Sequence, residues 1–252
     1  MIKITISNQR GGVGKTITAL TLARCLADEG KRVLLIDTDS QGSVWMALRL
    51  EPQYWLHHLV NDQMALSQVV VKAHEKIDVV CSDRRTMRVE GTLNAAMAKE
   101  MVFYEILRVA ESDYDAVLFD VAPSISNLQG CAMAYSRNVL IPVSMDSLAV
   151  EGAMASLTSI EMLNRLLKLG CRCIGFLPTQ IDQRTSATEV VLRTLDEQSK
   201  EQGIPLLPSI RTDQSVNKAL RNHSFLQDWD PKSRALEDYQ AACKMILKLS
   251  GA

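Results

Sequence analysis

Short apolar runs alternate along this chain with longer stretches of helical period. The first run, Met1–Ser7, alternates apolar and polar residues, whereas Val33–Asp37 (VLLID) is apolar up to its last residue, as is typical of a strand covered on both faces. Between them, apolar residues recur at helical spacing over Thr16–Glu29, and Gly30 follows. Strands that alternate with helices of this length predict an α/β fold: a mostly parallel, twisted sheet with helices on both faces.

The same alternation continues to the end of the chain. Further strands are expected at Ile77–Ser82, Ala116–Val121, Asn138–Val143, Cys173–Thr179 and, as a short one, Pro205–Leu207. Further helices are expected at Leu93–Ser112, Leu148–Leu169, Ser186–Gln202 and Arg234–Leu249, and mainly helical core at Trp45–Glu75. Because no repeat or Pro/Ser-rich linker interrupts the pattern, we expect one domain over residues 1–252.

The composition excludes several classes of protein. The formal net charge of the 252 residues is -1, so no basic field surrounds the whole molecule and any DNA binding needs a local patch. The sequence shows neither a signal-peptide pattern nor an apolar run long enough to span a membrane, so we expect a cytoplasmic protein without a transmembrane segment. None of the six cysteines forms a C-x-x-C pair, which favours buried free thiols over a metal or redox site.

A glycine-rich stretch, NQRGGVGKT at Asn8–Thr16, lies between the first expected strand and the first expected helix. Backbone N–H groups of such a turn cradle phosphates at the positive end of the helix dipole. In this arrangement Lys15 reaches the β- and γ-phosphates, and the hydroxyl of Thr16 suits Mg²⁺. The stretch therefore predicts a nucleotide-binding loop. The standard pattern, however, has a glycine where this chain has Gln9, with Arg10 beside it.

Three acidic residues follow expected strands. Asp37 and Asp39 belong to the segment DTDSQG, and Asp120 comes directly after the apolar residues Ala116–Phe119. The carboxyl ends of parallel strands meet at one edge of a sheet, and phosphoryl transfer needs carboxylates there to hold Mg²⁺ and orient water. The sequence therefore predicts a magnesium site beside the glycine-rich loop.

The segments RGGVGKT, DTDSQG and LFDVAPS together resemble the three motifs of the ParA/MinD family of deviant Walker A P-loop ATPases. In that family the loop reads K-G-G-x-x-K-[ST], and the lysine at the place of Arg10 reaches across an ATP-bound dimer to the nucleotide of the partner subunit. The resemblance implies ATP and Mg²⁺ as cofactors, and a homodimer that forms with ATP and hydrolyses it slowly. Arg10 keeps the positive charge but presents a planar fork on a longer arm, so we expect this contact to survive with changed geometry.

The resemblance also implies roles for single residues. Asp39 corresponds to the residue that positions the attacking water, and we expect it to form the catalytic set with Lys15 and Arg10. Asp120 is expected to contact Mg²⁺ through water, and Asp37 to support the same ion together with Thr16.

The nucleotide contacts implied by the resemblance extend along the whole loop. They comprise Arg10, Gly11, Gly12, Val13, Gly14, Lys15, Thr16 and Ile17, with Pro208 near the adenine. Ile17 stands where the family usually has a second hydroxyl, bonded to the α-phosphate, so that contact is expected to fall to backbone N–H groups. Ser40 replaces the proline of D-x-D-P-Q-G.

The C-terminal part of the chain resembles the ParA branch of the family. The segment Thr179–Thr185 (TQIDQRT) is similar to T-x-x-D-x-R-T, whose arginine contributes to non-specific DNA binding in ParA partition ATPases. We therefore expect DNA contacts at Arg184, and next at Arg211 and Arg221. Further candidates are Lys218, Lys232 and Arg234, and the alternative is a set of solvated surface charges.

The resemblance implies a nucleoid-associated ATPase switch that partitions or positions a plasmid, a chromosome or another cargo, with a ParB-type adaptor protein. Two alternatives stay open at this point. One is a MinD-like ATPase on a membrane surface, since the last expected helix carries apolar residues on one side with Lys244 and Lys248 nearby. That helix has few large apolar side chains, however, which favours a helix docked on the domain. The other alternative is a metabolic enzyme on the same fold.

Overall fold

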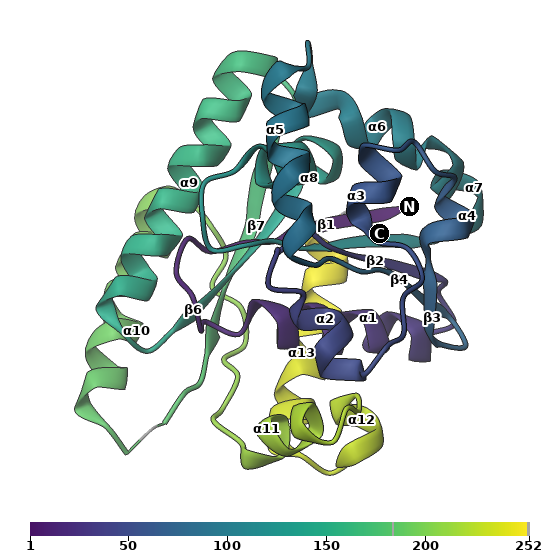
Figure 1. Ribbon diagram of the computed structural model, residues 1–252. Coiled ribbons are helices and arrows are strands. Elements are labelled where there is room, and N and C mark those ends of the chain that lie inside the picture. Colours follow the sequence, from purple (N-terminus) through teal and green to yellow (C-terminus); the bar gives the residue numbers. More distant parts are fainter. Residues whose placement is uncertain (183, 251–252) are drawn as a thin grey trace.

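The computed structural model describes residues 1–182 and 184–250. In them, a seven-stranded sheet with the order β3-β4-β2-β5-β1-β6-β7 forms the centre of the molecule (Figure 1). The strands are β1 (Ile2–Ile6), β2 (Val33–Asp37), β3 (Val71–His74), β4 (Ile77–Val80), β5 (Ala116–Asp120), β6 (Asn138–Ser144) and β7 (Arg172–Thr179). All neighbouring strands pair in parallel except β3, which is antiparallel to β4. The predicted mostly parallel α/β sheet is confirmed.

Helices cover both faces of this sheet. They are α1 (Lys15–Asp28), α2 (Ser43–Leu48), α3 (Leu56–Val60), α4 (Leu66–Val69), α5 (Met87–Ala95), α6 (Val102–Ile106), α7 (Ala110–Asp113), α8 (Asn127–Ser136), α9 (Ser147–Leu167), α10 (Ser186–Gln202), α11 (Gln214–Arg221), α12 (Leu226–Trp229) and α13 (Arg234–Leu249). One face packs against α1 and α13, which lie side by side in Figure 1. The opposite face packs against α3, α5, α6, α8 and α9.

The first four residues of strand β2 are apolar because the strand is covered on both faces. Val33 and Leu35 point into the cluster under α1 and α13, whereas Leu34 and Ile36 point into the cluster under α3 and α8. All four side chains are fully buried. Side chains of alternate residues thus point to opposite faces of the sheet. The acid that ends the strand, Asp37, lies at the carboxyl edge of the sheet.

Three expected elements are wrong. The helix over Leu93–Ser112 is broken: α5 ends at Ala95, Ala98 is left-handed with φ 53°, and short helices and 3-10 turns follow. Leu93, Phe103 and Leu107 enter the same core cluster although the helix is interrupted between them, so tertiary context overrides helix propensity here.

The second wrong element is the helical core expected at Trp45–Glu75. This segment contains α2, α3 and α4, but its end forms the antiparallel edge strand β3. The third is the strand expected at Pro205–Leu207, which is reduced to a single bridge between Leu206 and Phe176. Proline lacks the N–H that a ladder needs, and Pro205 and Pro208 stand on either side of the bridge.

The last helix, α13, docks on the domain. Its apolar side is buried against α1, and the hydroxyl of Tyr239 lies 3.1 Å from the hydroxyl of Thr18 on α1. The apolar residues that suggested a membrane contact include Ala242 and Ile246, which are 0% and 2% exposed. Of the two alternatives for this helix, the structure therefore shows the docked one. In the part of the chain that the structure describes, no helix is both long and apolar enough to cross a membrane.

Candidate functional site

The glycine-rich loop connects the carboxyl end of β1 to the first turn of α1. Gly14 precedes this helix with a left-handed φ of 87°, a conformation that glycine adopts without strain, and no side chain of the described residues caps the helix. The first N–H groups of α1 are therefore left for an outside acceptor, and the helix dipole favours an anion there. The loop thus has the backbone conformation that its sequence predicts.

Gln9, at the position of the missing glycine, anchors the loop to α9. Its side-chain amide donates to the carbonyl of Ala155 (3.1 Å) and to the hydroxyl of Ser159 (2.9 Å). Close packing is possible because α9 has Gly152 at this point: a Cβ there would lie 2.4 Å from Oδ1 of Asn8. The departure from the standard pattern is therefore a side chain with a structural contact, which the sequence alone did not reveal.

The second half of the loop is held from the end of β7. The hydroxyl of Thr179 donates to the carbonyl of Val13 (2.8 Å), and the side-chain amide of Gln180 donates to the carbonyl of Gly12 (2.6 Å). Both contacts leave the loop N–H groups free of these side chains. The loop is thus fixed from two sides by elements far away in the sequence.

Lys15 is folded back over the loop. Its Nζ donates to the carbonyl oxygens of Arg10 (2.9 Å) and Asn8 (3.1 Å), and the residue is 8% exposed. Burial lowers the pKa of Lys15, whereas the charges of Asp120 and Asp39 act against this shift. The structure therefore brings the predicted lysine into the field of two of the predicted acids.

Asp37 holds the turn that carries Asp39. Its carboxylate accepts the backbone N–H of Asp39 (2.9 Å) and that of Val44 (3.2 Å). Asp37 and Asp120 are register partners on the neighbouring strands β2 and β5. Burial raises the pKa of Asp37 well above its usual range, and the neighbouring charge of Asp120 adds to the shift.

Asp120 is a buried carboxylate without a protein partner. Within residues 1–182 and 184–250, neither of its oxygens has a hydrogen-bond partner, and the residue is 1% exposed. Burial raises the pKa of Asp120 to about 7, while the Thr16 hydroxyl and the charge of Lys15 act in the opposite direction. Buried carboxylates normally have partners, and Mg²⁺ binds carboxylates directly or through its waters. The donor set of Asp120 and Thr16 therefore fits a hydrated magnesium ion.

Asp39 and Arg10 lie at the rim of the site. Asp39 is half-buried, and its Oδ1 accepts the backbone N–H of Gln41 (2.9 Å). The guanidinium of Arg10 is half-exposed, with Nε 3.7 Å from Oδ1 of Asp146, the residue that caps α9. Arg10 therefore stands on the surface beside the loop, where a second molecule can reach it.

A hollow of about 330 Å³ opens beside Gly14 and Ile17, within the size range of small-molecule sites. The strip Ile210–Asp213 forms one wall, and Tyr239 of α13 and Asn217 of α11 contribute to the lining. Pro208 lies just before this strip. Sequence reasoning named Arg211 of this strip as a DNA contact, but it placed neither the strip nor Asn217 and Tyr239 beside the loop, because only the folded chain brings them there.

The predicted DNA-binding arginines are only partly brought together. Arg184 and Arg211 line a second hollow of about 260 Å³, together with Arg234, which the sequence ranked lower. Arg221 lies instead in the last turn of α11. Within the motif TQIDQRT, Gln183 lies outside the described residues.

Comparison with known proteins identifies relatives over most of the chain. A family model described as an AAA domain matches residues 1–170. The chain is 33% identical over 189 residues to the chromosome-partitioning ATPase Soj of Thermus thermophilus, covering 75% of this chain and 73% of the relative. It is 29% identical over 247 residues to the sporulation initiation inhibitor protein Soj of Bacillus subtilis, covering 96% and 97% of the two chains.

Solved structures share the fold. An ATP complex of a McdA variant from Cyanothece has a TM-score of 0.86 at 20% identity, covering 100% of this chain and 96% of the other. Cobyrinic acid a,c-diamide synthase from Mycobacterium smegmatis, solved with an ATP analogue and magnesium, has a TM-score of 0.85 at 24% identity, covering 98% and 95%. The ligands of these structures are those that the loop predicts, ATP and Mg²⁺. Because the family model spans more than half of this chain and the Thermus Soj ATPase is 33% identical over 75% of it, the chain belongs to the ParA-type family of partition ATPases.

Proposed function

We propose that this protein is an ATP-driven switch that pairs with a second copy of itself, binds DNA without sequence preference and positions a cargo such as a plasmid or a chromosome. One observation carries the proposal. An uncapped helix N-terminus and the buried, unpartnered Asp120 belong to elements that meet at one edge of the sheet, with Lys15 in the field of Asp120. This arrangement suits a triphosphate with its magnesium ion.

Nucleotide binding is proposed to change the partners of Lys15. Its bonds to the carbonyl oxygens of Asn8 and Arg10 are local, and phosphate oxygens are better acceptors for an ammonium group. The hydroxyl of Thr16 and, through water, the carboxylate of Asp120 are proposed to hold Mg²⁺, which neutralises charge on the phosphates. The hollow beside Ile17 has the volume for the nucleoside part.

Dimer formation and hydrolysis are assigned to the two residues at the rim. Arg10 is proposed to reach the nucleotide of the partner subunit, and Asp39 to orient the attacking water. A half-exposed guanidinium beside the loop and a half-buried carboxylate on the adjacent turn support these roles. ATP then favours the paired state, and slow hydrolysis ends it.

The protein is further proposed to bind DNA on the nucleoid and to act together with a ParB-type adaptor protein. The named relatives are chromosome-partitioning ATPases, and the arginine-lined hollow supports contacts to DNA phosphates. The burial of α13 against α1 favours this function over a membrane-surface one.

The test combines ATP hydrolysis with binding to a labelled random-sequence duplex. Lys15→Ala is expected to abolish ATP binding, and therefore both hydrolysis and ATP-dependent DNA binding. Asp39→Ala is expected to keep ATP binding and to lower hydrolysis by about a hundredfold or more. Wild-type protein that binds no ATP in equilibrium dialysis would contradict the proposal. Sedimentation with liposomes instead of DNA would support the membrane-surface alternative, and turnover of a small-molecule substrate the metabolic one.

A further inference from the structure

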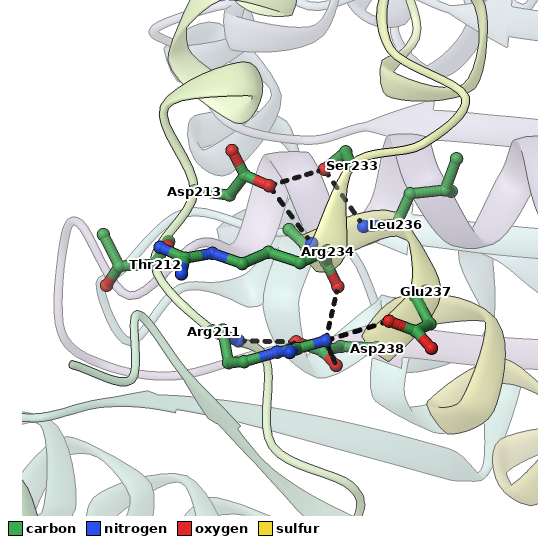
Figure 2. A network of polar contacts seen from close by, with 9 residues as sticks. Arg211, Thr212, Asp213, Ser233, Arg234, Leu236, Glu237 and Asp238 are labelled. Atoms are coloured by element: carbon green, nitrogen blue, oxygen red, sulfur yellow. Dashed lines mark hydrogen bonds and ion pairs between the residues drawn. The ribbon is translucent and has the colours of Figure 1, made fainter. Parts of the chain in front are cut away.

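Three arginines line the second hollow, and each already has an acceptor within the protein. Arg184, Arg211 and Arg234 come from the segment after β7, from the strip beside the nucleotide hollow and from the start of α13. Figure 2 shows how Arg211 and Arg234 lie among the polar groups of α13 and of the strip. The acceptors are carboxylates for two of the three arginines.

Arg211 forms ion pairs with two carboxylates of α13. Its Nε donates to Oδ2 of Asp238 (2.8 Å), and its Nη2 donates to Oδ1 of Asp238 (2.8 Å) and to Oε2 of Glu237 (3.1 Å). The backbone N–H of Arg211 also donates to Asp238 (2.9 Å). These bonds raise the pKa of Arg211 above its ordinary value. Its planar fork is therefore occupied by one carboxylate in bidentate geometry.

Arg184 is also bound by a carboxylate in bidentate geometry, but by one carboxylate instead of two. Its Nε and Nη2 donate to the two oxygens of Asp182 at 2.9 and 2.7 Å. The guanidinium beside Asp182 lowers the pKa of that carboxyl to about 2. Arg234 donates to the carbonyl of Thr212.

A carboxylate and a phosphate offer guanidinium the same two-oxygen acceptor geometry. Asp182 and Asp238 thus offer Arg184 and Arg211 the acceptor geometry that a phosphate would offer. With Glu237 they also balance the three arginines, so these six side chains carry no net charge. Arginines in this state attract DNA weakly, because non-specific binding depends on cations free to face phosphates.

The arginine hollow adjoins the hollow beside the loop. Arg211 and Thr212 line both, and Thr212 accepts the bond from Arg234. One residue further, Asp213 accepts from the hydroxyl of Ser233, which caps α13 (Figure 2). A nucleotide in the first hollow would therefore contact the strip that contains Arg211 and that accepts the bond from Arg234.

We propose that Asp182, Glu237 and Asp238 act as internal substitutes for DNA phosphates: they hold Arg184 and Arg211 in the nucleotide-free protein, and ATP favours the state in which both arginines face DNA. This inference rests on the proposed DNA-binding function. The three carboxylates are positioning residues in this scheme. The side chains of Arg184 and Glu237 are 88% and 79% exposed, and exposed ion pairs contribute little to stability, so these two contacts exchange readily for phosphates. The pair of Arg211 with Asp238, whose side chain is 14% exposed, is the contact that nucleotide must weaken.

The test measures fluorescence anisotropy of a labelled random-sequence duplex with full-length protein, with and without ATP analogue and Mg²⁺. The variants are Asp182→Asn and the double variant Glu237→Gln with Asp238→Asn. The double variant is expected to bind DNA about tenfold more tightly than wild type without nucleotide. Its DNA affinity is also expected to fall more steeply with salt: the slope of the logarithm of the binding constant against the logarithm of the salt concentration should become steeper by about one. A merely structural role of the carboxylates predicts neither change.

The matched control removes two acids elsewhere: Asp196→Asn with Glu201→Gln, on α10, where Asp196 pairs with Lys200. It changes net charge equally and is expected to leave DNA affinity within about twofold of wild type. Because Asp238 is largely buried, Glu237→Gln alone provides a second variant, and thermal melting checks that each protein folds.

The outcomes separate this inference from the function on which it rests. If wild type binds DNA only with ATP and the variants behave in the same way, the inference is overturned and the proposed function stands. If no protein binds DNA under any condition, both are overturned. Variants that bind while wild type does not, even with ATP, would confirm the restraint by carboxylates and overturn its release by nucleotide.

Discussion

At the scale of single residues, the site is organised around a buried carboxylate, Asp120, whose oxygens have no hydrogen-bond partner within the described part of the chain. Asp120 is buried beside Asp37 and within the field of Lys15, and burial raises its pKa to about 7. In the unfolded chain an aspartate has a pKa of about 4. Asp120 therefore binds its proton more tightly in the folded protein. Its contribution to stability is present at low pH and is lost as the pH rises from about 4 to about 7.

Asp120→Asn is expected to remove this pH dependence. At pH 8 without nucleotide, the variant should have a higher free energy of unfolding than wild type by about 2 to 4 kcal/mol, and at pH 4 the difference should vanish. Urea unfolding at several pH values measures it, and Asp196→Asn, a half-exposed acid on α10, is the control. The same variant should lose magnesium-dependent ATP affinity. If the difference in free energy of unfolding between variant and wild type is the same at pH 4 and at pH 8, the pKa of Asp120 is not raised by folding.

At the scale of elements, helix α9 supports the loop. Gln9 bonds to α9, Arg10 lies near its cap Asp146, and Gly152 lets the loop approach closely. The sequence predicted the loop, the helix and the glycines of the loop, because each depends on local chemistry. It did not predict the contact of Gln9 with α9, since nothing local relates two segments about 150 residues apart.

Gly152→Ala tests this support. The new Cβ would lie 2.4 Å from Oδ1 of Asn8 and 2.9 Å from the backbone N of Arg10, so the loop must shift, and we expect ATP affinity to fall about tenfold or more. Isothermal titration measures the affinity. Gly130→Ala on α8 is the matched control, because its Cβ would meet nothing within 4 Å; it should leave ATP affinity unchanged. Unaltered affinity in both variants would mean that α9 is only packed against the loop.

Element boundaries show the same limit of sequence reasoning. Strands covered on both faces and the helices α1, α9 and α13 were predicted close to their observed bounds, because burial patterns are strong there. The helix expected at Leu93–Ser112 was wrong because the chain leaves the helical conformation at Ala96 and Ala98, and the apolar pattern on either side of this break does not reveal it. In the candidate site, the acids at strand ends were predictable from the parallel sheet, whereas the wall that Ile210–Asp213 forms beside the loop was not.

At the scale of the whole molecule, the face that carries the loop also carries an arginine, Arg10, that is only loosely paired with a carboxylate. The guanidinium of Arg10 is 45% exposed, and its nearest carboxylate, Asp146, lies at 3.7 Å, longer than a hydrogen bond. An arginine placed in this way is free to change partner, and a triphosphate held by a second copy of the chain offers a stronger one. Pairing of two molecules through this face would place each Arg10 at the other molecule's site.

Arg10→Ala is therefore expected to weaken ATP-dependent pairing by about tenfold or more, because a charge-assisted contact to phosphate is lost in each half of the dimer. Arg10→Lys restores the lysine of the resembled family, and we expect it to keep pairing. Light scattering with a non-hydrolysable ATP analogue, over a range of protein concentrations, measures the dimer. Arg193→Ala, on the exposed side of α10, controls for loss of an arginine. If Arg10→Ala pairs as wild type does while binding ATP normally, Arg10 makes no contact across the interface, and pairing must depend on other residues of this face.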